Sequence, residues 1–141
     1  MKKTLLSILA VMLVSCCMFG FVGCVAALTP EEELVVGKYE VISLSITNSS
    51  VKASDYDYFT MEFFANRKCF VKSKLGATTY EADATWKINS DGEIEVVTRE
   101  GRATATEKYR LDGDIISGTN SGFVNNSIIT VTVSLQRIVE E

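Results

Sequence analysis

The residue types that carry most enzyme and metal chemistry are scarce in this sequence. It has no histidine, no Cys-x-x-Cys pair and no glycine-rich phosphate loop, so an ordinary imidazole base, a zinc site and a phosphate-binding loop are missing. The remaining candidates are acids beside glycines, in LDGD around Gly113 and NSDGE around Gly92. Neither stretch holds the full set of oxygen ligands that calcium needs, and aspartate next to glycine is typical of hairpin turns.

These observations bear on the class of protein. We expect no catalytic residue, no metal and no cofactor, and we predict that the chain is not an enzyme. An enzyme that used carboxylates alone remains an alternative, and it would need two acids that converge in one cleft.

The first 23 residues have the charge pattern of an export signal. The chain opens with MKK and carries no charged residue from Thr4 to Gly23. A run of about 20 uncharged residues could also span a bilayer as a helix, so an uncleaved membrane anchor is one alternative. A signal of the non-lipoprotein kind, cut near Ala26 or Ala27, is another.

Cysteine placement favours a lipid anchor. Residues 21–24, Phe-Val-Gly-Cys, resemble the end of a bacterial lipoprotein signal, in which apolar and then small residues precede the cysteine that becomes the lipidated first residue. Residues 13–16, Leu-Val-Ser-Cys, match that tetrapeptide better but leave an apolar segment on the mature protein. We therefore predict lipidation at Cys24, with Cys16 as second choice. Two acyl chains suffice for stable anchoring, so the resemblance implies a location at the extracytoplasmic face of the cell membrane.

The predicted mature protein is acidic and has one further cysteine. Removing residues 1–23 takes away two lysines and no acid, which changes the formal charge from −4 to −6. No basic stripe interleaved with aromatic residues is present, and nucleic-acid binding is therefore disfavoured. With Cys24 acylated, Cys69 has no partner for an internal disulfide. We interpret Cys69 as a buried strand cysteine, because no histidine is present to activate its thiol.

The rest of the chain predicts strands. Apolar residues alternate with polar ones along short segments, and a slip of this pattern between Val41 and Ile42 indicates a bulge. Connections of two to five residues force neighbouring strands to be antiparallel, which gives a meander. The predicted strands are residues 38–46, 59–63, 69–73, 81–88, 93–98, 103–111, 114–119 and 128–138.

Eight strands in a meander can remove both sheet edges by closing into a barrel. The outward positions are too polar to face lipid, so the barrel is expected in water. The order of Gly-Lys-Tyr at residue 37, Trp-Lys before an Asp-Gly turn, and Leu-Asp-Gly-Asp before the penultimate strand resembles lipocalin-like small lipoproteins of clostridial-type bacteria, over residues 36–139. The resemblance implies an all-β, antiparallel up-and-down eight-stranded barrel of the lipocalin-like, calycin type. It also implies a shorter final hairpin than the segment Gly118–Thr130 suggests.

The predicted organisation has three parts. Residues 1–23 form a lipoprotein signal peptide, residues 24–35 the lipidated cysteine with a tether, and residues 36–141 the barrel domain. LTPEEE in the tether predicts a solvated spacer or one short helical turn, capped by Thr29 with Pro30 at its first position.

A candidate ligand site follows from the inward positions. Continuing the alternation of the strand at residues 103–111 places Glu107 inward, where an unpaired carboxylate is costly. We hypothesise that Glu107 is a polar contact in a cavity for a small apolar or amphipathic molecule; a bulge or an open barrel mouth that returns it to solvent is the alternative. The candidate lining residues are Phe59, Met61, Phe63, Trp86, Glu107 and Tyr109.

A second function class is a protein-interaction or inhibitor module at the cell envelope. Loops on rigid barrels often carry recognition, and aromatic side chains anchor partners. The predicted loops are Thr47–Tyr58 and Gly118–Ser127, with Tyr56, Tyr58 and Phe123 as candidate anchors. The protein partner and the ligand are not identified by the sequence.

The lipidation prediction can be tested in cells. A Cys24→Ala variant should move from the membrane fraction to the soluble fraction and keep the circular dichroism spectrum of the barrel, because the predicted anchor is separate from the strands. A Cys16→Ala variant is the matched control and should stay in the membrane fraction. Membrane association of Cys24→Ala would instead favour acylation at Cys16 or an uncleaved helix.

Overall fold

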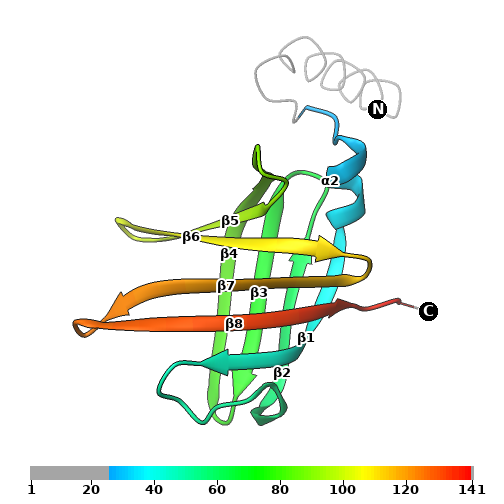
Figure 1. Cartoon of the computed structure of the whole chain (residues 1–141). Coiled ribbons are helices and arrows are strands. Elements are labelled where there is room, and N and C mark those ends of the chain that lie inside the picture. Colours follow the sequence, from blue (N-terminus) through cyan, green and yellow to red (C-terminus); the bar gives the residue numbers. More distant parts are fainter. Residues whose placement is uncertain (1–25, 141) are drawn as a thin grey trace, which may run out of the picture.

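The computed structural model describes residues 26–140, and its strands close into a barrel (Figure 1). Each strand pairs antiparallel with its sequence neighbours, and β8 returns to pair with β1. The predicted all-β, antiparallel, up-and-down, eight-stranded barrel is confirmed. Its elements are α2 (Pro30–Val35), β1 (Gly37–Ile46), the 3-10 helix η1 (Ala53–Asp55), β2 (Tyr56–Phe63), β3 (Lys68–Leu75), β4 (Thr78–Ile88), β5 (Ile94–Glu100), β6 (Ala103–Asp112), β7 (Ile115–Val124) and β8 (Ser127–Arg137).

Side-chain alternation along these strands builds the interior. Directly opposed residues of an antiparallel pair share one face of the sheet. The register places buried residues opposite each other, as with Trp86 and Val96. On the outer face it places opposite charges together, as with Lys72 and Glu81, whose Nζ and Oε1 atoms are 3.5 Å apart. The period-two pattern of the sequence therefore separates an apolar inside from a polar outside.

The predicted bulge in the first strand is present. The pairing of β1 with β8 shifts register between Val41 and Ser43, and the residue between them, Ile42, is 49% exposed. β1 pairs with β2 through Gly37–Glu40 and with β8 from Tyr39 to Ile46, so both neighbours are paired just before the bulge. The bulge therefore lies where the barrel closes.

The final hairpin is longer than predicted, so the expected loop over Gly118–Ser127 was wrong. The ladder between β7 and β8 runs without interruption from Ile115 opposite Gln136 to Val124 opposite Ser127. Two pairs of hydroxyls support it across the strands, Thr119 with Thr132 at 3.0 Å and Ser121 with Thr130 at 2.8 Å. Asn125 and Asn126 both have positive φ, of 49° and 63°, which is the backbone geometry of a tight two-residue hairpin turn. The expected loop over Thr47–Tyr58 is also shorter, because β2 begins at Tyr56.

β6 and β7 pair through their backbones only next to the turn that joins them, and the last pair is Arg110 with Ser117. Farther from that turn, the side chain of Asn120 bridges the two strands. Oδ1 of Asn120 accepts the Lys108 backbone N–H at 2.8 Å, and Nδ2 of Asn120 donates to the Lys108 carbonyl at 3.3 Å. Gly118 lies so close to β6 that a Cβ there would collide with the Lys108 carbonyl. A glycine and an asparagine thus hold the barrel wall together where backbone pairing stops.

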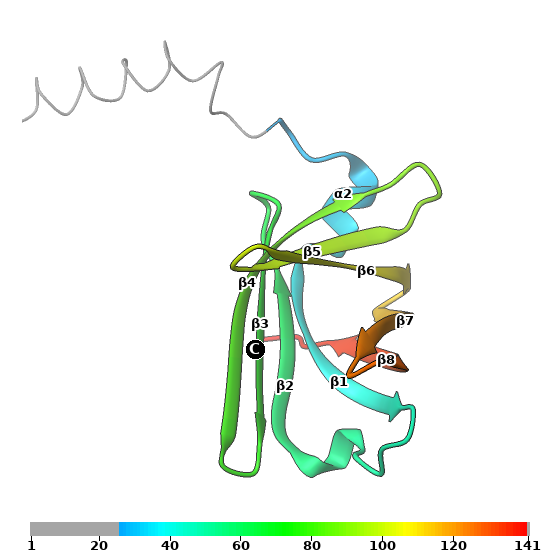
Figure 2. The same ribbon diagram turned by 90° about the vertical axis from the view of Figure 1, so that its left-hand side faces the viewer.

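The segment before β1 is a structured cap on one end of the barrel, not a free spacer. Thr29 begins α2 with a capping box: its hydroxyl accepts the Glu32 N–H at 3.2 Å, and Glu32 accepts the Thr29 N–H at 2.9 Å. Pro30 stands at the first helical position, as the helical alternative predicted. Val35 is buried in the core below, where its carbonyl accepts the Tyr39 hydroxyl at 2.9 Å. Figure 2 shows α2 at the end of the barrel opposite the β3–β4 turn.

Two arginines attach this cap to the strands. Arg67, in the β2–β3 turn, donates from Nη2 to Glu32 Oε2 at 2.8 Å and from Nη1 to the Ala26 carbonyl at 2.8 Å. Arg137, at the end of β8, donates from Nη1 to the Val36 carbonyl at 2.7 Å, and its guanidinium lies 4.8 Å from the centroid of the Tyr39 ring. Both arginines satisfy backbone carbonyls near α2 that would otherwise lack partners.

The ion pair of Arg67 and Glu32 sets the pKa of the buried acid. Hydrogen bonding from Arg67, followed by that from the Thr29 N–H, holds the pKa of Glu32 below its ordinary value despite burial. A lowered folded-state pKa means that the carboxylate contributes stability above the ordinary glutamate pKa of about 4.3. That contribution is lost as the pH falls through the lowered value.

We predict that Arg67→Met destabilises the protein by about 1–3 kcal/mol at neutral pH, because it leaves a largely buried carboxylate without its cation. Urea denaturation should show the loss, and the loss should shrink at acidic pH, where wild-type Glu32 is protonated as well. Arg102→Met, at an exposed position in the β5–β6 turn, is the control and should unfold like the wild type. Equal stability of the Arg67 variant would show that the cap is not coupled to the barrel.

Candidate binding cavity

The barrel interior is packed at the end that α2 covers. The rings of Tyr39 and Phe63 meet edge to face at 5.7 Å, and those of Phe63 and Trp86 at 5.8 Å. Nε1 of Trp86 donates to the Phe64 carbonyl at 3.0 Å, which satisfies its polar atom inside the core. Phe63 and Trp86, two of the candidate lining residues, therefore belong to this packed end and do not line the cavity at the other end.

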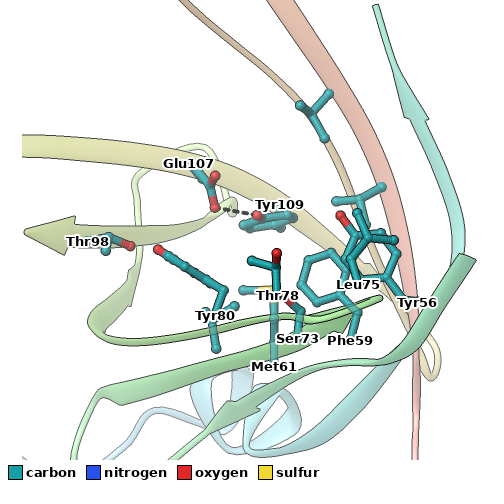
Figure 3. Close-up of a pocket in the computed structure, with 13 residues that line it drawn as sticks. Tyr56, Phe59, Met61, Ser73, Leu75, Thr78, Tyr80, Thr98, Glu107 and Tyr109 are labelled. Carbon is teal, nitrogen blue, oxygen red and sulfur yellow. Dashed lines mark hydrogen bonds between the residues drawn. The ribbon is translucent and has the colours of Figure 1, made fainter. Parts of the chain in front are cut away.

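The opposite end of the interior holds a cavity of about 420 Å³. Four of the six candidate lining residues line it, namely Phe59 and Met61 from β2 and Glu107 and Tyr109 from β6. Inward residues of β3, β4, β5 and β8 complete the lining (Figure 3). Its volume falls within the range of small-molecule sites, roughly 300–1,000 Å³. Hollows of about 540 and 500 Å³ also lie elsewhere, but charged side chains such as Lys68 and Arg137 border them.

Glu107 lies on the inward face of β6. The pairing of β5 with β6 continues without a register shift from Ile94 to Glu100, and Glu107 stands opposite the buried Val96. No bulge therefore turns it outward. Its side chain is half-buried, and Oε2 accepts the Tyr109 hydroxyl at 2.6 Å (Figure 3).

The Glu107–Tyr109 pair places an acceptor inside an apolar cavity. Burial, and next the nearby Glu107 carboxylate, raise the pKa of Tyr109. Tyr109 therefore remains a neutral hydroxyl that donates to Glu107 across the whole physiological pH range. The carboxylate keeps further acceptor positions, since two carboxylate oxygens offer about four.

The mouth of the cavity carries a second acid that sequence reasoning missed. A smaller hollow of about 230 Å³ adjoins the cavity and shares Tyr80, Thr98 and Glu107 with it. Glu100 lines this hollow and accepts the Tyr80 hydroxyl at 3.2 Å. Burial and then the hydrogen bond to Glu100 raise the pKa of Tyr80. The sequence did carry a signal for Tyr80. Tyr80 is two residues before Ala82 in β4, so the alternation of side chains places both on the inward face.

Two acids thus share one hollow at the mouth, and each already accepts a tyrosine hydroxyl. Ala103 and Ala105, on the same face of β6 as Glu107, are exposed and line the same hollow. Small residues there leave space instead of interlocking with large ones. The arrangement offers acceptor oxygens to a bound molecule, and the absence of enzyme activity stays a prediction.

The three candidate partner-binding aromatics do not form one cluster. Tyr56 and Tyr58 lie in β2, not in a loop. Tyr56 lines the cavity, with its ring 5.4 Å from that of Phe59. Tyr58 faces outward beneath the Lys72 ammonium, 5.5 Å from the ring centroid. Phe123 is 79% exposed near the tip of the β7–β8 hairpin. Strict alternation would put Tyr56 and Tyr58 on one face, because they are two residues apart. A register shift between them in the pairing of β2 with β3 sends them to different faces.

Cys69 is buried in β3, as its sequence context indicated. Burial, followed by the charges of Glu107 and Glu62, raises the pKa of its thiol to about 12. Cys69 is therefore a packing residue. The candidate lipidation sites, Cys24 and Cys16, lie outside the described residues.

Residues 26–140 lack two kinds of structural feature. No helix in that range is long and apolar enough to cross a membrane. No group of three or more histidine, cysteine, aspartate or glutamate residues there is placed to hold a metal ion.

Comparison with known proteins adds little beyond the fold. No protein-family model matches the chain, and no curated protein matches it at a significant level. Among solved structures the chain is similar to one described as "Odorant Binding Protein OBP1", with a TM-score of 0.48 and 16% sequence identity over 82% of this chain and 77% of that chain. At that identity the similarity concerns backbone shape alone, and the description of the barrel here rests on its strand register.

Proposed function

We propose that the barrel binds a small apolar or amphipathic molecule in its interior. The single observation that carries the proposal is the cavity of about 420 Å³, which is lined by inward side chains of six strands and open at one end. Most of its lining is aromatic or aliphatic, with a few polar groups that could fix a ligand's orientation. Each square ångström of apolar ligand surface buried there contributes roughly 25 cal/mol.

The rest of the barrel makes this cavity a preformed site. The packed aromatic end and the arginine-held cap close one end of the interior, so a ligand would enter from the end near the β3–β4 turn. A rigid wall lowers the entropic cost of binding, because little of the protein has to become ordered around the ligand.

We further propose that the protein works at the extracytoplasmic face of the cell membrane, held by lipid at Cys24. The support is the export-type charge pattern and the lipoprotein-like tetrapeptide. The Ala26 carbonyl is bound by Arg67 at the capped end. A lipid two residues earlier would keep that end at the membrane surface and direct the cavity mouth away from it.

Filling the cavity should abolish binding. Val131, in β8, lines the cavity, whereas the next residue, Thr132, is exposed on the outer face. We predict that Val131→Trp lowers the affinity for the neutral fluorophore phenylnaphthylamine at least about tenfold, because the indole takes up ligand space. Thr132→Trp, the same substitution on the opposite face, should leave fluorescence titrations unchanged. Equal binding by both variants, or no binding by the wild type, would refute an internal site.

A second candidate function is a protein-interaction module, and one observation favours it. At the tip of the β7–β8 hairpin, the exposed fractions are 79% for Phe123, 56% for Val124 and 58% for Ile128. Phe123 and Ile128 lie opposite each other, so they form one small apolar patch. Clustered exposed aromatic and aliphatic side chains on a projecting hairpin are a common anchor for a partner.

The patch can be tested with a photoreactive amino acid. Placed at Phe123, it should form a discrete protein adduct in cells that express the full chain, because the patch would be covered by the partner. Placed at Thr106, an exposed position on β6, it should form none. The same adduct from both positions, or none from Phe123, would count against a partner at this hairpin.

A further inference from the structure

We propose that the cavity selects cationic amphiphiles: molecules with an apolar alkyl or aryl body and one protonated amine, which binds at Glu107. This proposal rests on the internal ligand site proposed above and names the chemical class of its occupant. An apolar cavity alone would accept fatty acids, alcohols and amines alike. The charges around it decide among them.

The charge on the cavity wall has one sign. Glu107 lines the cavity and Glu100 lines the adjoining hollow at its mouth, while no lysine or arginine of residues 26–140 lines either space. The basic residues next to Glu107 and Glu100 in the sequence lie on the outer face of the barrel. Lys108 is exposed and stands opposite Glu95 on the outer face, and Arg99 is exposed opposite Thr104.

Glu107 has acceptor capacity that the protein does not use. Its recorded hydrogen bond comes from the neutral Tyr109 hydroxyl, and no ion pair from a described lysine or arginine reaches it. A half-buried carboxylate attracts a cation more strongly than a fully exposed one does, because the surrounding dielectric is lower. An ammonium group donates three hydrogen bonds and supplies that missing charge.

The position of Glu107 suits an amphiphile lying along the barrel axis. Glu107 belongs to both spaces, so it lies where the deep cavity meets the mouth. The apolar residues Met61 and Val133 line the deep part, where an alkyl or aryl body would pack. The faces of Tyr80 and Tyr109 beside the carboxylate add aromatic surfaces that attract an ammonium. A fatty-acid head group would instead bring a second negative charge next to Glu107.

Three molecules of equal chain length separate these alternatives. Octylamine, octanol and octanoate are titrated against the full-length protein carrying phenylnaphthylamine at neutral pH. Octylamine should displace the fluorophore at a concentration at least about tenfold lower than octanoate, because a buried charge pair replaces a like-charge contact. Octanol should fall between them.

Substitution of the acid assigns the preference to one residue. Glu107→Gln keeps size and acceptor oxygen but removes the charge, so octylamine affinity should fall about tenfold while octanol affinity changes less than about twofold. Glu40→Gln, at an exposed position of β1 outside the cavity lining, corrects for the general attraction of cations to an acidic protein and should change neither. Glu107→Asp, which retains charge, should retain a preference for octylamine over octanoate.

The outcomes separate failure of the selectivity from failure of the site. Octanoate binding as tightly as octylamine, or an unchanged octylamine affinity in Glu107→Gln with wild-type circular dichroism, would overturn the proposal while leaving the internal site intact. If neither the fluorophore nor any octyl compound binds the wild type, the internal site itself is refuted. If Glu107→Gln fails to fold, the Glu107→Asp variant and the three-compound comparison on the wild type decide.

Discussion

The pairing of β1 with β8 is the interaction on which the rest of this structure depends. β1 pairs with β2 through its first residues and with β8 along most of its length, and the bulge between Val41 and Ser43 lets it do both. Closure removes the exposed edges that an eight-stranded meander would otherwise have. It also gives the inward side chains a shared interior, in which Tyr39 from β1 and Leu135 from β8 are both fully buried. Without this pairing the chain would have neither a core nor a cavity.

The two ends of that interior differ because one end has a cap. α2 lies over the aromatic packing around Phe63, and Arg67 and Arg137 hold it by charge and by backbone carbonyls. The other end, where η1 and the β1–β2 connection lie (Figure 2), holds the cavity. The end under α2 therefore holds the packed core, and the opposite end holds the cavity. The lowered pKa of Glu32 at the cap and the raised pKa of Tyr109 in the cavity reflect this division. Glu32 has a cation beside it, whereas Tyr109 is buried and has a carboxylate beside it.

An apolar cavity with a carboxylate in its wall, and no lysine or arginine of residues 26–140 there, restricts which molecules can bind in it. Shape and apolar surface set affinity in such sites, and a few polar groups set orientation and selectivity. Glu107 and Glu100 each accept a tyrosine hydroxyl, so both carboxylates have a hydrogen-bond partner within the protein before any ligand arrives. The hairpin tip at Phe123 is a separate feature on β7, outside the cavity lining, and its apolar exposure concerns a different kind of contact.

The sequence alone determined the strands, their order and the bulge at Val41, because these follow from a period of two and from local turn chemistry. For Glu107 it left an inward position and a return to solvent both open, and the unshifted register of β5 and β6 decided between them. The sequence could not determine depth along the barrel: Phe59 and Phe63 share a face, yet Phe59 lines the cavity and Phe63 lies in the packed core. Nor could it supply contacts between distant segments, such as Arg67 with Glu32, or predict how far the last hairpin extends. Alternation fixes the face on which a side chain lies. Only closure and the cap decide whether that face meets other side chains or an open cavity.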